Sequence, residues 1–200
     1  MTAVITDAGG TLRVVRPLLR AGAVLVAGSG VVERRCPGAV RGPDGTAFVA
    51  TLVDQYMNET GTHPSGRCRR RAAGRTLRAR TRSPWHVWHA VLRLAPTDPR
   101  LSEDEWSRVA RRTVADMGFE RPEDGVFDEA FRECRWAGLL CRAGTVGDSA
   151  TVLHLVANVV REDGRVWSCW QDERRLRGAC ERIEDALGLR RTGRGAEART

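Results

Sequence analysis

One apolar run contains two polar side chains whose spacing could serve chemistry. Residues 151–165 read TVLHLVANVVREDGR, in which a largely apolar stretch ends at an Asp-Gly pair. This pattern predicts a strand followed by a hairpin turn. Because side chains alternate between the faces of a strand, His154 and Asn158 share one face. The opposite face, from Leu153 to Val159, is uniformly apolar, so we expect helices to cover it and His154 to stand on the open side.

A second stretch, WHVWHAVLRL at residues 85–94, is rich in aromatic and β-branched residues and stops at a loop sequence. It predicts a strand on which His86 and His89 point to opposite faces. One of them can therefore face His154 across the sheet, either as a metal ligand or in a structural role. Tryptophans near these strands can stack on bases, although such residues more often belong to the core. They are Trp85, Trp88, Trp167 and Trp170.

The arginines are unevenly distributed along the chain. The 200 residues carry a formal charge of +8. Up to Ser83, fourteen arginines accompany five acidic residues, whereas the remainder has nineteen arginines and twenty acidic residues. Such a basic excess indicates a polyanionic partner, although biased codon usage accounts equally well for the total. Eight arginines lie in a polar stretch that we interpret as a linker or a DNA-binding arm: Arg67, Arg69, Arg70, Arg71, Arg75, Arg78, Arg80 and Arg82.

Helix and turn signals surround these two strands. Ser102 and Glu105 form a capping box, in which each side chain satisfies a free N–H group of the first helical turn. Asp172 is placed to cap a later helix. The elements expected after the first strand are a helix, a strand, the return strand of the hairpin and a second helix, at 102–118, 135–142, 166–170 and 172–188.

This order of elements indicates an α+β fold, an antiparallel β-sheet with helices packed on one face. We expect the sheet domain at 84–189, followed by a disordered tail at 190–200. Residues 1–83 form a poorly defined basic segment that contains the Arg-rich linker 67–83, with helix-like spacing at 47–59. No apolar run approaches the ~20 residues of a membrane span and no clear export signal is present, so we expect a cytoplasmic protein.

Four stretches between Trp85 and Leu189 match one known group in order. They read WHVWHAVLRLAPTD, LSEDEWSRVARRTVADMG, HLVANVVREDGRVW and DERRLRGACERIEDALGL. Together they resemble the relaxases, or mobilization nucleases, of actinobacterial plasmids, which are HUH endonucleases. The resemblance implies an antiparallel sheet whose central strand holds a divalent metal through a histidine–hydrophobic–histidine triplet. It also implies a tyrosine that attacks single-stranded DNA and leaves a 5′-phosphotyrosyl link.

The chain departs from the family pattern at the metal site. The family triplet aligns with Val152, Leu153 and His154, so the first histidine is missing. The family's remaining ligand lies a few residues upstream, where Asp148 is the available group. Asp148 is therefore a candidate oxygen ligand beside His154, or else a residue that only stabilises a turn. The metal expected in an active protein is Mg²⁺ or Mn²⁺.

The catalytic residues implied by the resemblance are Tyr56 and Asn158. Tyr56 is the only tyrosine of the chain, so a tyrosine mechanism must use it or fail. Its helical surroundings differ from the family motif. Asn158 matches a polar position of the family, although it can also serve only to hold the strand in place.

We therefore expect a relaxase-like mobilization protein that binds single-stranded or plasmid-origin DNA. If active, it nicks that DNA by metal-dependent phosphodiester transfer, together with conjugation accessory or coupling proteins and without membrane insertion. The alternative is an inactive or truncated relaxase remnant that acts only as a DNA-binding protein. A third reading is a small structural domain. Because the ligand set is incomplete, whether the protein is an enzyme stays open.

Overall fold

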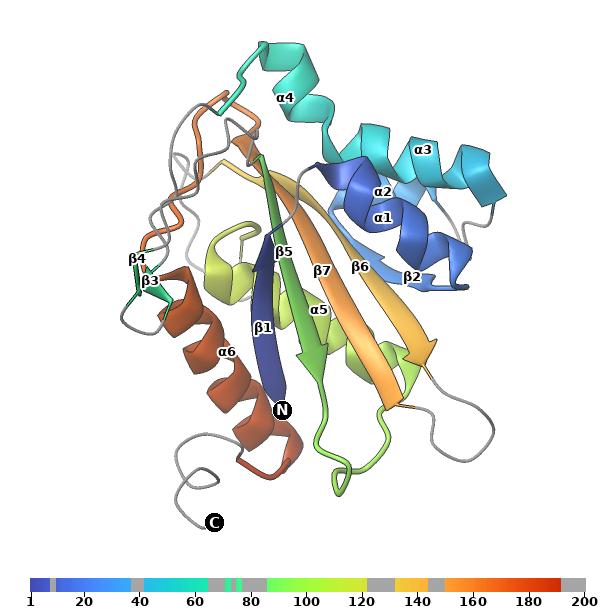
Figure 1. The fold of residues 1–200 in the computed structure, drawn as a ribbon, viewed down its shortest axis with the longest axis vertical. Helices are drawn as coiled ribbons and strands as arrows, with labels where there is room; N and C mark the ends of the chain where they lie inside the picture. The colour runs from blue at the N-terminus through green and yellow to red at the C-terminus, as the bar shows by residue number, and fades with distance from the viewer. Residues whose placement is uncertain are drawn as a thin grey trace.

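The computed structural model describes residues 1–7, 10–36, 42–64, 71–72, 75–76, 86–121, 132–143 and 150–191. Five strands form one antiparallel sheet with the spatial order β1-β5-β7-β6-β2. The α+β fold with an antiparallel sheet is thus confirmed (Figure 1). The strands are β1 Thr2–Asp7, β2 Val24–Gly28, β5 Val87–Arg93, β6 Cys134–Ala143 and β7 Ala150–Arg161, with a separate pair formed by β3 Arg71–Ala72 and β4 Arg75–Thr76.

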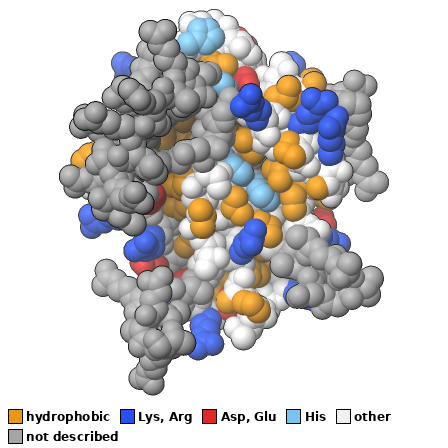
Figure 2. All heavy atoms as spheres, viewed as in Figure 1, with side chains coloured by type: hydrophobic (Ala, Val, Ile, Leu, Met, Phe, Trp, Pro, Cys, Tyr) orange, Lys and Arg blue, Asp and Glu red, His pale blue; other side chains and the backbone are white. Residues whose placement is uncertain are grey.

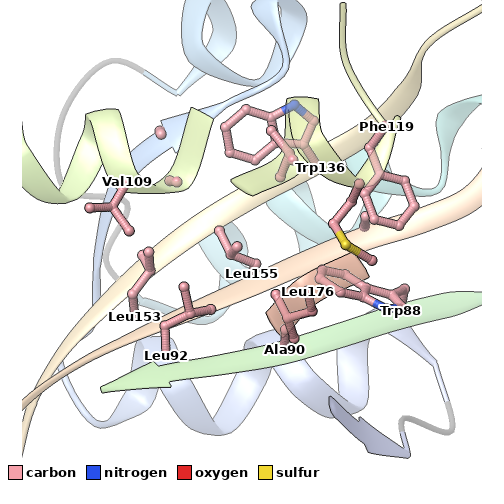
Figure 3. Close-up of a cluster of buried hydrophobic side chains, with 14 of the residues drawn as sticks. Trp88, Ala90, Leu92, Val109, Phe119, Trp136, Leu153, Leu155 and Leu176 are labelled. Atoms are coloured by element: carbon pink, nitrogen blue, oxygen red, sulfur yellow. The ribbon is translucent and has the colours of Figure 1, made fainter. Parts of the chain in front are cut away.

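One face of the sheet is covered by α5, Glu103–Met117, and α6, Asp172–Leu187. This is the apolar face of β7 that the alternation predicted, since Leu153 and Leu155 are fully buried against these helices. Large aromatic side chains fill the remaining space of this core (Figure 3). Those no more than 2 % exposed are Trp88, Trp106, Phe119, Trp136 and Trp167.

Helices also cover part of the other face, which differs from the expectation of helices on one face only. They are α1 Thr11–Arg20, α2 Gly30–Arg35, α3 Gly42–Val53 and α4 Gln55–Thr60. Apolar side chains of α1, α2 and α3 form a second core with Val87, Leu139 and Val156. None of the helices in the described ranges is long and apolar enough to cross a membrane.

The described residues among the first 64 therefore take part in the main fold. β1 pairs with β5 and β2 pairs with β6, so both outer strands of the sheet come from the N-terminal part of the chain. The helix expected at 47–59 is present as α3 and α4. The elements β1, α1, β2 and α2 were not predicted because they are short, and because α1 contains Pro17, which usually breaks a helix.

Most local expectations for the later residues are confirmed. The capping box of Ser102 and Glu105 is formed, and both α5 and α6 end at glycines in the left-handed conformation. The prediction of a return strand at 166–170 is wrong. An isolated bridge between Val160 and Val166 is found there instead of a strand. The indole of Trp167 instead packs on Phe119 and donates to the carbonyl of Met117, which draws the chain into the core.

The start of α6 also differs from its prediction. Asp172 is the first residue of the helix, whereas Gln171 occupies the capping position with a positive φ of 57°. The carboxylate of Asp172 accepts from the next backbone N–H, that of Glu173, at 2.9 Å. Asp172 therefore still stabilises the first turn, but from inside the helix.

An ion pair joins the two helical layers at one edge of the sheet. Glu33 of α2 pairs with Arg111 of α5 and accepts from the backbone N–H of Gly28 at the end of β2. α2 and α5 belong to opposite layers, and β2 is the outermost strand on this side. The Glu33–Arg111 contact therefore passes around the outer edge of β2.

Replacing Ser102 by Ala should lower the free energy of unfolding by about 1 kcal/mol, because the N–H of Glu105 loses its acceptor and the capping box opens. The measurement is urea denaturation followed by circular dichroism. Ser107→Ala, a change within the same helix, is the matched control and should leave stability within about 0.5 kcal/mol. Equal losses in the two variants would contradict the role of the cap.

Candidate functional site: a histidine pair on the sheet

His154 and His89 form a hydrogen-bonded pair on two adjacent strands. Nε2 of His89 lies 3.1 Å from Nδ1 of His154, and the rings are nearly parallel, with an interplanar angle of 16°. On its other side, Nδ1 of His89 lies 2.5 Å from the hydroxyl of Thr6. A chain of three polar side chains thus crosses β1, β5 and β7 in the order Thr6, His89, His154.

Both imidazoles are neutral at neutral pH. Burial, together with the neighbouring His154, lowers the pKa of His89 from 6.5 to about 4. Burial and the nearby Arg93 also lower the pKa of His154. Each ring therefore carries one N–H, and the hydrogen bond between the rings links the tautomer of one ring to that of the other.

Two arrangements of these protons satisfy the chain. If Thr6 donates to His89, then His89 donates to Nδ1 of His154, whose own proton sits on Nε2. In the reverse direction His154 donates to His89 and presents the Nε2 lone pair instead. The outer nitrogen of His154 is thus a donor in the first arrangement and an acceptor in the second.

The pair lies at the boundary between the covered and open parts of its sheet face. Val156 and Asn158, further along β7, are fully buried, whereas His154 and His89 are only partly buried. Figure 2 shows histidine side chains in the middle of this face, among apolar side chains and with arginines nearby. The register places Arg93 and Val4 on the same open part; Arg93 is exposed and Val4 is 60 % exposed.

Asn158 belongs to a second polar cluster, beneath the helices. Its Nδ2 donates to Oδ1 of Asp54 at 2.7 Å, and its Oδ1 accepts from the backbone N–H of Val160. The same Asp54 oxygen accepts from the hydroxyl of Thr11 at 2.5 Å and lies 3.8 Å from Nε2 of His86. Asp54 sits between α3 and α4, so the cluster ties these helices and the start of α1 to the sheet. The hydrogen bonds of Asn158 hold the strand and the helices together.

Tyr56 does not meet His154. The guanidinium carbon of Arg135, on β6, lies over the ring of Tyr56 at 4.3 Å from the ring centroid. Residue 139 of β6 pairs with His154, and Arg135 is four residues away, or about 13 Å along the strand. Burial also raises the pKa of Tyr56, which opposes formation of a phenolate nucleophile. The predicted nucleophile and the predicted metal ligand therefore lie at different ends of the face.

Other predicted site residues lie outside the described residues. These are Asp148 and most of the arginine cluster, while Arg71 and Arg75 are described only through the backbones of β3 and β4. In the described ranges, no three His, Cys, Asp or Glu side chains converge as a metal site would require. Two imidazoles alone do not suit Mg²⁺ or Mn²⁺, which prefer oxygen ligands. We derive no metal-dependent step.

The sequence pointed to His154 and to one of His86 and His89 as its neighbour, which the structure identifies as His89, but it did not identify the groups that hold the pair. Thr6 lies 83 residues before His89, and the one signal for it is the weak alternation of β1. Asp54 lies 104 residues before Asn158, inside a helical stretch with no sign of a long-range partner. Both contacts arise from tertiary packing alone.

Asn158→Ala should lower the free energy of unfolding by about 2–3 kcal/mol, because it leaves one oxygen of Asp54 and the N–H of Val160 with fewer partners in a buried place. Chemical denaturation measures this loss. Asn58→Ala, on the exposed side of α4, is the matched control and should be nearly neutral. A neutral Asn158→Ala would contradict the anchoring role.

The histidine pair should also make stability depend on pH. Between pH 6.5 and about 4 the unfolded chain binds a proton at His89 that the folded chain does not. Stability is therefore complete above pH 6.5 and falls as the pH is lowered toward 4, by on the order of 3 kcal/mol. The lowered pKa of His154 adds a loss of the same sign.

Urea unfolding at a series of pH values tests this dependence. His89→Gln should remove most of the loss between pH 6.5 and 4, whereas His63→Gln, at an exposed position, should retain it. An unchanged pH profile in His89→Gln would show that another group is responsible.

Comparisons of the chain with protein-family models, with curated proteins and with solved structures found no match to any of them.

Proposed function

We propose that the chain is a relaxase-like mobilization protein that binds single-stranded or origin DNA of a plasmid or integrative element on the sheet surface around His154. The observation that carries the proposal is the position of His154. It lies on the central strand of an antiparallel sheet, on a partly open face, and is hydrogen-bonded to His89 of the adjacent strand. This position supports the expectation, based on the resemblance to relaxases, that His154 stands on the DNA-binding face of the central strand.

The chemistry of the surface suits a nucleotide backbone. In one of its two proton arrangements, the neutral His154 directs an N–H outward, and this group can donate to a phosphate oxygen. The exposed Arg93 can bind a phosphate through two parallel hydrogen bonds. Val4 and Val91 offer apolar contact for sugars and bases, and the partly exposed imidazole rings can stack with bases.

Cleavage of DNA is a second candidate function. It is supported by the position of His154 on the β-strand that carries the histidine motif in the family that the chain resembles. Tyr56 lies at the other end of the face, beneath Arg135. DNA binding without cleavage is therefore the function that the geometry of the described residues supports best. It corresponds to the DNA-binding alternative among the sequence-based expectations.

Binding of a labelled single-stranded oligonucleotide by the full chain, followed by fluorescence anisotropy, tests the proposal. His154→Ala and Arg93→Ala should each weaken binding about three- to tenfold, because each removes one contact to the backbone. His63→Ala, an exposed histidine elsewhere, is the matched control and should bind like the unchanged protein. Absence of binding at low salt, or equal affinity in all variants, would refute the proposed function.

A nicking assay distinguishes the two candidates. The full chain is incubated with a 5′-labelled oligonucleotide and Mg²⁺ or Mn²⁺, and the products are separated on a denaturing gel. We expect neither a shorter strand nor a covalent protein–DNA adduct, and no difference between the unchanged protein and Tyr56→Phe. An adduct that forms in the unchanged protein and disappears in Tyr56→Phe would establish the nuclease instead.

A further inference from the structure

Helix α1 carries three arginines without local charge compensation. Arg13, Arg16 and Arg20 are exposed, and their spacing of three and four residues places them on one side of the helix. The ten residues of α1 include no acidic side chain. In the described part of the chain, none of the three arginines forms an ion pair.

The helices on the other face of the sheet are different. α5 has four acidic residues and three arginines, and α6 has five acidic residues and four arginines. Several of these arginines are paired, as Arg111 is with Glu33 and Arg182 with Asp116. Uncompensated arginines are therefore a feature of α1, which lies on the side of the sheet that carries the histidine pair.

α1 also lies next to the candidate site. Its inward side chains Val15 and Leu19 pack in the second core with Val156, which follows His154 on the same face of β7 about 7 Å away. The three arginines span about 10 Å along the helix axis, from residue 13 to residue 20. Figure 2 shows arginine side chains on the same face as the central histidines, over the region that Figure 1 assigns to α1 and α3.

Exposed apolar side chains accompany these arginines. Leu12 of α1 is 46 % exposed and Phe48 of the adjacent α3 is 42 % exposed. Proteins that bind single strands combine arginines that follow the backbone with side chains on which unpaired bases stack. A duplex keeps its bases inside and would leave Leu12 and Phe48 without partners. The combination therefore favours a single strand over a duplex.

We propose that the outer side of α1, formed by Arg13, Arg16 and Arg20 with Leu12 and Phe48, binds the sugar–phosphate backbone of single-stranded DNA and leads it to the histidine pair. We call it the α1 arginine surface. The inference rests on the proposed function and deepens it, because it names the path of the DNA beyond His154. It assigns this contact to residues outside the arginine cluster at 67–82.

The test compares two triple variants of the full chain. Arg13, Arg16 and Arg20 are replaced by Glu in one; Arg108, Arg174 and Arg177, exposed on α5 and α6, are replaced by Glu in the other. Both variants change the net charge equally, so a general loss of attraction affects them alike. Affinity for labelled oligothymidine of about 20 nucleotides is measured by anisotropy at several salt concentrations.

The α1 variant should bind at least tenfold more weakly than the unchanged protein, and its plot of log K against log salt should be shallower by about 2, because three phosphate contacts are lost. The control variant should keep most of the affinity and the slope. Thermal melting monitored by circular dichroism should show that both variants are folded. A slope unchanged in the α1 variant, or reduced equally in both, overturns the inference while the proposed function stands.

Two further measurements address the nature of the partner. Phe48→Ala should weaken binding to oligothymidine about threefold or more and leave binding to a duplex of the same length unchanged. Equal loss on both would overturn the assignment to a single strand. Co-sedimentation with phosphatidylglycerol vesicles, in place of oligonucleotide binding, would overturn the assignment to nucleic acid. If the unchanged protein binds no DNA at low salt, the proposed function and this inference fall together.

Discussion

The alternation of side chains along β7 is the constraint on which the rest of the molecule depends. β7 is hydrogen-bonded on both edges, to β5 and to β6, so its backbone cannot rotate to hide an unsuitable side chain. Between Leu153 and Val159 one of its faces is apolar and is covered by α5 and α6. The other carries His154 and Asn158, and each needs a polar partner or solvent. Asn158 lies under the helices on that face, and His154 lies where their cover ends.

The two polar side chains on this face of β7, His154 and Asn158, find their hydrogen-bond partners in different ways. Asn158 lies under the helices and is satisfied by Asp54, so it contributes to holding the layers together. His154 lies where the cover ends and is satisfied on one side by His89, which leaves its outer nitrogen for another molecule. Partial burial keeps both rings uncharged and rigidly oriented. A neutral imidazole beside an arginine can bind a phosphodiester group, and this is the reason for favouring DNA as the ligand.

The sequence predicted the parts of the structure that local rules decide. The capping box at Ser102, the strand through His154 and its apolar face follow from spacing alone. The elements β1, α1, β2 and α2 were not predicted because short helices and edge strands have weak periodicity and are stabilised mainly by packing. The return strand after the hairpin was wrong because Trp167 has a partner, the carbonyl of Met117, 50 residues earlier in the chain. The hydrogen bond from Thr6 to His89 and the role of Asp54 depend in the same way on contacts between distant segments.

The ion pair between Glu33 and Arg111 has a consequence for association between molecules. An outermost strand exposes unpaired N–H and C=O groups, which offer another chain a place to add a strand. Side chains from both helical layers meet across β2, and the carboxylate also occupies the N–H of Gly28. This contact hinders the addition of a foreign strand at the end of β2.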